Sequence, residues 1–178
     1  MDDRIFEPAG LESTTYPAWD DLSLPEPFIH GYDRNADTWV DCSVETFGRG
    51  DGAIISTARD TARFFRALLV ERSLLAPELL ALMMSVVPDD PPAELTLLGV
   101  PTTIGYGLGL FSQPVSCGTI WGHSGGGFGY AHLPFVRLDT GRIAIAMRNA
   151  SFGFRQLTNE ALARRLTFSA AFRSSLFC

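Results

Sequence analysis

The part of the sequence best equipped for chemistry runs from Trp121 to Tyr130. Its histidine and serine, His123 and Ser124, are neighbours, and both side chains can move protons or donate hydrogen bonds to a reacting group. The next residues, Gly125 and Gly126, have no side chain, so another backbone can approach the strand closely at this point. Two catalytic interpretations fit these residue types, and the surrounding elements must decide between them.

In the first interpretation Ser124 is a nucleophile. Gly122–Gly126 satisfies the G-x-S-x-G pattern of α/β-hydrolases, in which the serine sits on a sharp turn between a strand and a helix. Here more glycines and a predicted strand follow the serine. That fold also places an acid and then a histidine after the nucleophile, yet His132 precedes the later acids Asp139 and Glu160. An α/β-hydrolase with a Ser124 nucleophile therefore stays as an alternative.

The elements that must position this segment are predicted from periodicity and turn signals. Residues 5–50 are rich in proline, glycine, aspartate and aromatics, which predicts an extended loop with short turns. A capping-box pattern from Thr57 to Asp60, followed by apolar residues on one face, predicts a helix over 57–71. Two further helices are expected at 77–86 and 156–172.

Four strands are predicted, at 103–111, 119–123, 128–136 and 142–149. The last two are joined across residues 139–141 as an antiparallel hairpin. Both faces of 143–147 are apolar, which favours a central strand covered by helices on either side. The predicted fold class is α+β, with an antiparallel sheet of about four strands flanked by helices.

In the second catalytic interpretation, His123-Ser124-Gly125 is a motif on an active-site strand. Three other segments occur with it, in the order Ile5–Leu11, Asp51–Asp60 and Tyr106–Leu110. Together these segments resemble the serine β-lactamase-like family, nearest to the D-alanyl-D-alanine carboxypeptidases and class C β-lactamases. The resemblance covers essentially the whole chain. It implies that residues 1–178 are the C-terminal part of a single β-lactamase-like serine hydrolase domain, with a partial β-lactamase/transpeptidase-like fold.

The resemblance also implies roles for the residues of the motif. His123-Ser124-Gly125 would be the third of three family motifs, following a Ser-x-x-Lys nucleophile and a Tyr-x-Asn motif. His123 would polarise the proton-relay groups, and Ser124 would donate to a substrate carboxylate. Gly125 would let the substrate backbone lie close to the strand, and the N–H of Gly126 would form half of an oxyanion hole.

The first two family motifs are missing from this chain. All 14 basic side chains are arginine, so Ser-x-x-Lys cannot occur, and none of the four tyrosines begins Tyr-x-Asn. The chain is therefore expected to be inactive alone, and whether it is an enzyme in its own right stays open.

Three cysteines leave one unpaired whatever the pairing, and composition does not choose among Cys42, Cys117 and Cys178. The family resemblance implies a disulfide between Cys117 and Cys178. Such a bond favours an extracytoplasmic, secreted parent protein. The first residues, Met1 to Arg4, do not resemble a secretory signal peptide.

Composition excludes several kinds of partner. The net charge of −6 and the lack of clustered basic residues argue against a nucleic-acid partner. The longest apolar stretch, 79–87, is too short to span a membrane. Three scattered histidines predict no metal site, and nothing in the sequence predicts a cofactor.

Three functional hypotheses follow. The favoured one is part of a penicillin-recognising serine hydrolase that acts on a small peptide, ester or β-lactam substrate. In this first hypothesis, a partner chain could supply the missing half of the domain. The second is a non-catalytic module that binds a peptide or a partner chain. The third is the α/β-hydrolase with Ser124 as its nucleophile.

Overall fold

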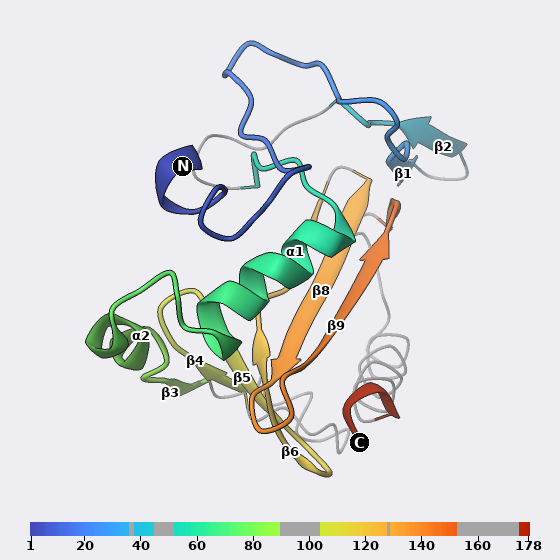
Figure 1. Cartoon of the computed structure of the whole chain (residues 1–178). Coiled ribbons are helices and arrows are strands. Elements are labelled where there is room, and N and C mark those ends of the chain that lie inside the picture. The colour runs from blue at the N-terminus through green and yellow to red at the C-terminus, as the bar shows by residue number, and fades with distance from the viewer. Residues whose placement is uncertain (36–37, 45–51, 90–103, 128, 153–174) are drawn as a thin grey trace.

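A computed structural model describes residues 1–35, 38–44, 52–89, 104–127, 129–152 and 175–178 (Figure 1). A short 3₁₀ helix at Asp2–Arg4 opens the chain. The helices are α1, Ala58–Phe65, which continues as a π-helical stretch at Arg66–Val70, and α2, Pro77–Met83. The strands are β1 Tyr32–Asn35, β2 Thr38–Asp41, β3 Val87–Asp89, β4 Ile104–Tyr106, β5 Phe111–Val115, β6 Gly118–Gly122, β7 Gly125–Gly127, β8 Tyr130–Arg137, β9 Arg142–Arg148 and β10 Ala150–Phe152.

Within the described part of the chain the main sheet has seven strands, and all of their pairings are antiparallel. β6 and β7 pair with β8 in one continuous register, because Gly122 lies opposite Phe135 and Gly125 lies opposite His132. The two short strands are thus halves of one long strand, interrupted at residues 123–124. β9 pairs with the other side of β8.

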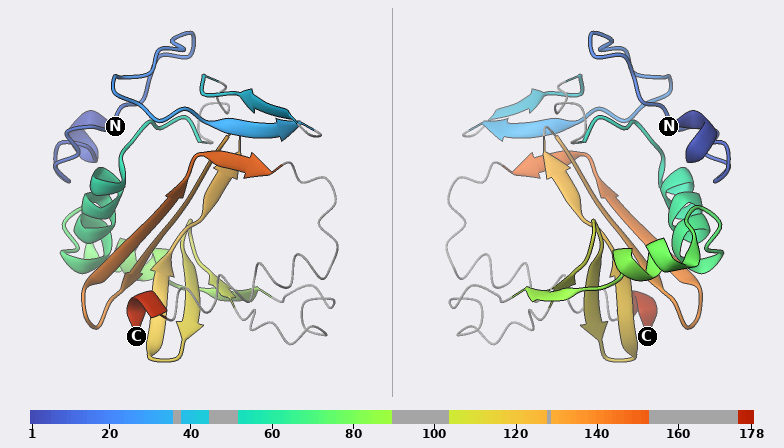
Figure 2. Two further views of the ribbon diagram at one scale, coloured as in Figure 1. Left: turned by 90° about the vertical axis from the view of Figure 1, so that its right-hand side faces the viewer. Right: turned by 90° about the vertical axis from the view of Figure 1, so that its left-hand side faces the viewer.

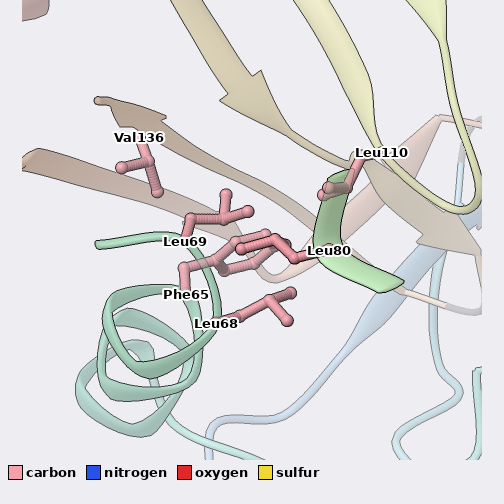
Figure 3. Close-up of a cluster of buried hydrophobic side chains, with 6 residues drawn as sticks. All are labelled: Phe65, Leu68, Leu69, Leu80, Leu110 and Val136. Carbon is pink, nitrogen blue, oxygen red and sulfur yellow. The ribbon is translucent and has the colours of Figure 1, made fainter. Parts of the chain in front are cut away.

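Helix α1 lies across β8 and β9 (Figure 1), and together with its π-helical continuation it contributes three of the six side chains of the main buried cluster. Thr57 caps the helix, since its hydroxyl accepts a hydrogen bond from the Asp60 N–H at 3.2 Å. The apolar face of the helix packs against the sheet and against α2. The buried side chains of this cluster are Phe65, Leu68, Leu69, Leu80, Leu110 and Val136 (Figure 3). Each fully buried side chain of this kind contributes about 1.5–3 kcal/mol of stability.

The carboxylate of Asp60 fastens the N-terminal segment to α1. Its side chain is 1% exposed. One oxygen accepts the Ser13 N–H at 2.6 Å and the Thr14 hydroxyl at 2.9 Å. Arg63 approaches the other oxygen at 3.3 Å. The capping-box prediction is therefore half right: Thr57 caps the helix, while the Asp60 side chain binds a segment more than 40 residues earlier in the chain.

A second, three-stranded sheet has the order β10-β1-β2 and lies at one end of the main sheet (Figure 2). β1 is parallel to β10 and antiparallel to β2. The Tyr130 hydroxyl donates to the Ile29 carbonyl at 2.7 Å, and the Asn149 amide donates to the His30 carbonyl at 3.1 Å. Because Tyr130 also pairs with the last residue of β7, the small sheet is tied directly to the strand that carries the glycines.

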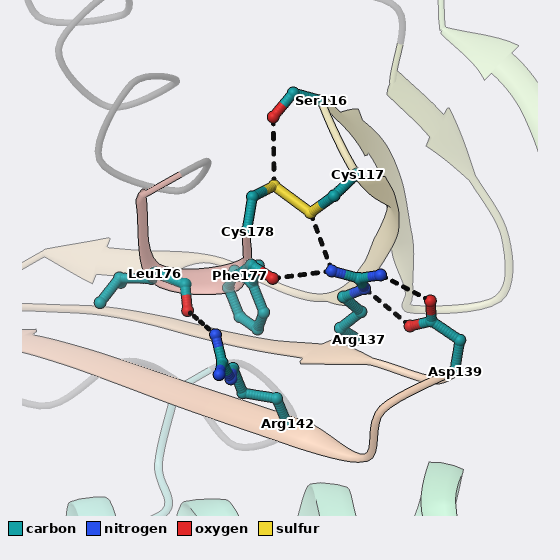
Figure 4. Close-up of a disulfide and its surroundings, with 8 residues drawn as sticks. All are labelled: Ser116, Cys117, Arg137, Asp139, Arg142, Leu176, Phe177 and Cys178. Carbon is teal, nitrogen blue, oxygen red and sulfur yellow. Dashed lines mark hydrogen bonds and ion pairs between the residues drawn. A yellow bond between two sulfur atoms is a disulfide. The ribbon is translucent and has the colours of Figure 1, made fainter.

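At the opposite end, a disulfide joins Cys117 to Cys178, with 5.6 Å between the Cα atoms (Figure 4). This is the pairing that the family resemblance implies. Arg137 supports it, since one guanidinium nitrogen donates to the Phe177 carbonyl at 2.8 Å and another lies 2.7 Å from Asp139. The Phe177 ring is buried against the sheet. Cys42, whose state the sequence left open, is a buried thiol outside this bond.

The α+β class, the antiparallel sheet and the first two helices are confirmed. The predicted count of about four strands is wrong, because the described residues already form seven strands in the main sheet and three in the small one. The predicted strand 103–111 is two strands, β4 and β5, separated by a turn in which the Gly107 N–H donates to the Leu110 carbonyl at 2.8 Å.

Other predictions need correction as well. The region 5–50, predicted as loop, contains the β1–β2 hairpin. The stretch 143–147, predicted as a central strand, belongs to β9, which pairs only with β8 among the described residues. α2 ends at Met83, and β3 follows it. The predicted helix 156–172 lies outside the described residues.

His30, Asp41 and Ser43 form a polar cluster that should give a pH-dependent contribution to stability. Hydrogen bonds from Ser43, and then one from His30, lower the pKa of Asp41 from 3.8 to about 2. A carboxyl group whose pKa is lowered by folding stabilises the fold at pH values above its ordinary pKa. This contribution is lost as the pH falls toward the pKa of the folded state.

We expect Asp41→Asn to flatten the dependence of unfolding free energy on pH between about 4 and 2. Urea unfolding at a series of pH values measures it. Parallel curves for wild type and variant would contradict the prediction.

Candidate active site

His123 lies where the strand formed by β6 and β7 is interrupted. The register of the flanking pairs leaves Pro134 of β8 opposite His123. The Pro134 carbonyl points toward β6, so close that a Cβ on Gly122 would lie 1.9 Å from its oxygen. Proline has no N–H with which to extend the hydrogen-bond ladder on this side. The break at His123 and Ser124 therefore has a local cause in the opposite strand.

The imidazole of His123 is held between two aromatic side chains. It stacks on Phe111, with the ring centroids 4.6 Å apart and the planes at 16°. Its Nε2 lies 3.3 Å from the hydroxyl oxygen of Tyr106. Tyr106 ends β4 and lies opposite Phe111, the first residue of β5, which in turn lies opposite Gly122. Strand pairing thus fixes both contacts.

After Ser124 the strand continues as three glycines. Gly125 could not carry a side chain without movement of its neighbour, since a Cβ there would lie 2.7 Å from Cε1 of His132. Gly126 is exposed. Among the described residues β7 pairs only with β8, so its other edge faces no described strand. Because glycine has no side chain, nothing on these three residues themselves covers the backbone groups of that edge.

His132 is the second imidazole near the motif. Partial desolvation, and then the proximity of His123, lower the pKa of His132. Lowering the pKa of a histidine favours its neutral form at neutral pH. The neutral form of His132 is therefore favoured relative to an ordinary histidine.

The surroundings of Ser124 do not match a nucleophile elbow. A strand, β7, follows the serine where an elbow requires a helix. The described residues also hold no group of three or more side chains suited to bind a metal ion. No helix among them is long and apolar enough to cross a membrane.

The described fold is mixed, with an antiparallel sheet, a helix across one face and a His-Ser-Gly segment between β6 and β7. Residues 1–167 match the family model described as Beta-lactamase. The chain therefore belongs to the β-lactamase family.

Solved structures share this fold. A D-stereospecific amidohydrolase from Streptomyces sp. is 32% identical, with a TM-score of 0.67 over 84% of this chain and 42% of that one. A D-amino acid amidase from Ochrobactrum anthropi SV3, complexed with L-phenylalanine amide, is 23% identical, with a TM-score of 0.70 over 98% of this chain and 50% of that one. An octameric penicillin-binding protein homologue from Pyrococcus abyssi is 21% identical, with a TM-score of 0.65 over 84% of this chain and 33% of that one. The chain thus spans half or less of the length of these structures.

The structure brings His123, Ser124, Gly125 and Gly126 together in one continuous stretch, as their adjacency in sequence requires. It adds three residues to which sequence reasoning gave no role: Tyr106, Phe111 and Pro134. Tyr106 belongs to a segment that carried the family resemblance, but its contact with His123 depends on the register of β4, β5 and β6. No local pattern in the sequence reveals that register.

Proposed function

We propose that this chain is the C-terminal part of one serine hydrolase domain, and that it forms the wall of the active site against which the substrate lies. The parent reaction is acyl transfer from an amide, ester or β-lactam to a serine, followed by hydrolysis. The observation that carries the proposal is the strand 123–127, where His123 and Ser124 stand at a break and a side-chain-free edge continues beyond them.

Each residue of this strand has a role in the proposal. His123 donates a hydrogen bond to the proton-relay groups, and Ser124 donates to a carboxylate or carbonyl of the substrate. Gly125 and Gly126 let the backbone of the substrate lie against the backbone of the strand. The Gly126 N–H stabilises the oxyanion. The nucleophile's own N–H completes the oxyanion hole. Because the chain has no lysine, the Ser-x-x-Lys nucleophile must come from the rest of the domain or from a partner chain.

The substrate class in the proposal is a D-amino acid amide or a peptide with a D-residue at the scissile bond. The support is the similarity to the Streptomyces D-stereospecific amidohydrolase, at 32% identity. An extended substrate that pairs with β7 would be chosen by backbone geometry, and that geometry differs between D- and L-residues. Since disulfides persist mainly outside the cytoplasm, the Cys117–Cys178 bond supports an extracytoplasmic parent protein.

The experiment compares this chain with a longer protein expressed together with its natural upstream coding sequence. Both are incubated with a fluorescent penicillin and examined by intact mass, and both are assayed with D- and L-phenylalanine amide. We expect an adduct on an upstream Ser-x-x-Lys serine and preference for the D-amide in the longer protein, and no adduct on the chain alone. An adduct on Ser124 would instead support the α/β-hydrolase alternative. An upstream sequence without Ser-x-x-Lys would overturn the proposal and favour a non-catalytic binding module.

In the longer protein, Ser124→Ala tests the role of the motif itself. A hydrogen bond to a charged group contributes about 1.5–3 kcal/mol, so kcat/KM for a substrate with a free carboxylate should fall about 10- to 100-fold. Ser23→Ala, which changes an exposed serine far from the motif in sequence, is the matched control and should leave kcat/KM unchanged. If Ser124→Ala and Ser23→Ala had the same kcat/KM, Ser124 would have no role in binding the substrate.

A further inference from the structure

The contact between Tyr106 and His123 goes beyond the family motif. The hydroxyl oxygen of Tyr106 is 3.3 Å from Nε2 of His123, and the two ring centroids are 6.0 Å apart with the planes at 64°. Phe111 covers one face of the imidazole and also lies 4.8 Å, centroid to centroid, from the Tyr106 ring. The three rings therefore form one cluster in which the imidazole has a fixed plane and a fixed edge.

This cluster belongs to the sheet. Tyr106, Phe111 and Gly122 lie opposite one another on β4, β5 and β6, and His123 directly follows Gly122. Gly105, next to Tyr106, packs so tightly that a Cβ there would lie 2.5 Å from the Ser112 hydroxyl. The pairing of β4, β5 and β6 therefore fixes the position of the Tyr106 hydroxyl beside Nε2 of His123. A shift of one strand relative to the next would break the backbone hydrogen bonds between them.

A neutral imidazole has one N–H and one bare nitrogen, and the hydrogen bond at one nitrogen decides where the proton sits. A tyrosine side chain is normally un-ionised at neutral pH and carries one O–H. Between phenol and imidazole, the phenol is the stronger donor and the bare imidazole nitrogen the stronger acceptor. The favoured arrangement is therefore Tyr106 O–H donating to a bare Nε2 of His123.

We propose that Tyr106 is a positioning residue that holds neutral His123 in the tautomer protonated at Nδ1. The remaining N–H of the ring, at Nδ1, is then the donor that His123 offers to the site. The catalytic meaning of this donor rests on the proposed function, whereas the tautomer itself does not. Tyr106 acts through His123, without contact with the substrate.

The test is NMR of the full chain labelled with ¹⁵N-histidine, at about pH 8.5 so that histidines, with an ordinary pKa of ~6.5, are neutral. The chain has three histidines, so single His→Gln variants assign the signals. We expect long-range proton–nitrogen correlations to show a protonated Nδ1 and a bare Nε2 for His123. In Tyr106→Phe the ratio of the two tautomers should move toward Nε2–H by about fivefold, the loss of one ordinary hydrogen bond.

Two controls keep the test decisive. Tyr130→Phe removes a phenol that donates to the Ile29 carbonyl, and it should leave the His123 tautomer unchanged. His30, whose Nδ1 lies 2.7 Å from the Asp41 carboxylate, should keep the same Nδ1 signal in Tyr106→Phe and Tyr130→Phe as in the wild type, and so reports an intact fold. The proposal is overturned if wild-type His123 is protonated at Nε2, or if Tyr106→Phe leaves its tautomer ratio unchanged while His30 is unaffected. Neither result bears on the penicillin adduct, so failure here is distinguishable from failure of the proposed function.

Discussion

Replacing Asp60 by alanine should lower the free energy of unfolding by about 3–5 kcal/mol, as expected when one partner of a buried charged network is removed. The carboxylate is 1% exposed and accepts hydrogen bonds from Ser13 and Thr14, with Arg63 beside it. Without it, the Ser13 N–H and the Thr14 hydroxyl lose their acceptor in a partly buried place. The N-terminal segment then keeps only its weaker attachment to α1, the hydrogen bond from Arg63 to the Gly10 carbonyl and the exposed Arg63–Glu12 pair. Urea unfolding followed by circular dichroism measures the change.

Glu12→Gln is the matched control for Asp60→Ala. Glu12 also faces Arg63, at 3.3 Å, but its side chain is 79% exposed. Exposed ion pairs contribute about 0–1 kcal/mol, so this variant should be nearly as stable as the wild type. If both variants lost the same free energy of unfolding, the loss would come from the ion pairs of Arg63 and not from the buried hydrogen bonds of Asp60.

Replacing Cys178 by serine should cost about 4 kcal/mol. The disulfide closes a loop of 61 residues, and the loss of chain entropy in the unfolded state predicts a contribution of this size. The bond also keeps Phe177 buried against β6 and β8, where its carbonyl accepts from Arg137. Urea unfolding of Cys178→Ser, compared with wild type in the presence and absence of a reducing agent, measures the contribution.

Reduced wild type and Cys178→Ser should unfold at the same urea concentration, below that of oxidised wild type. Cys42→Ala is the control, because Cys42 lies outside the bond and this variant should keep the full response to reduction. Intact mass provides an independent check, since breaking one disulfide adds two hydrogens, about 2 Da. An unreduced mass equal to the reduced mass would show that the two cysteines are not joined.

The sequence predicted those parts of the fold whose signals are local. The helix after Thr57 has a cap, a 3.6-residue apolar period and adequate length, and it begins where predicted. The hairpin of β8 and β9 has strong strand formers on both sides of Asp139-Thr140-Gly141. The candidate site residues are adjacent in sequence, so one short motif sufficed to find them.

The parts that were missed depend on contacts between distant residues. β5 contains Gln113 and Pro114, poor strand formers, and it is a strand because β4 and β6 pair with it on both sides. β1 forms against β10, which follows more than 100 residues later. The role of Asp60 was misassigned for the same reason, since its partners lie in a segment without periodicity. Tertiary pairing overrode local preference in each case.

The break in the strand opposite Pro134 has a consequence for how this family can diversify. The residue at position 123 is outside the hydrogen-bond ladder, so the strand pairing places little demand on its β-propensity. A lysine or another polar residue could replace the histidine there while every strand kept its register. The side chain that this position offers can thus be changed by a point substitution without a change in the pairing of the sheet.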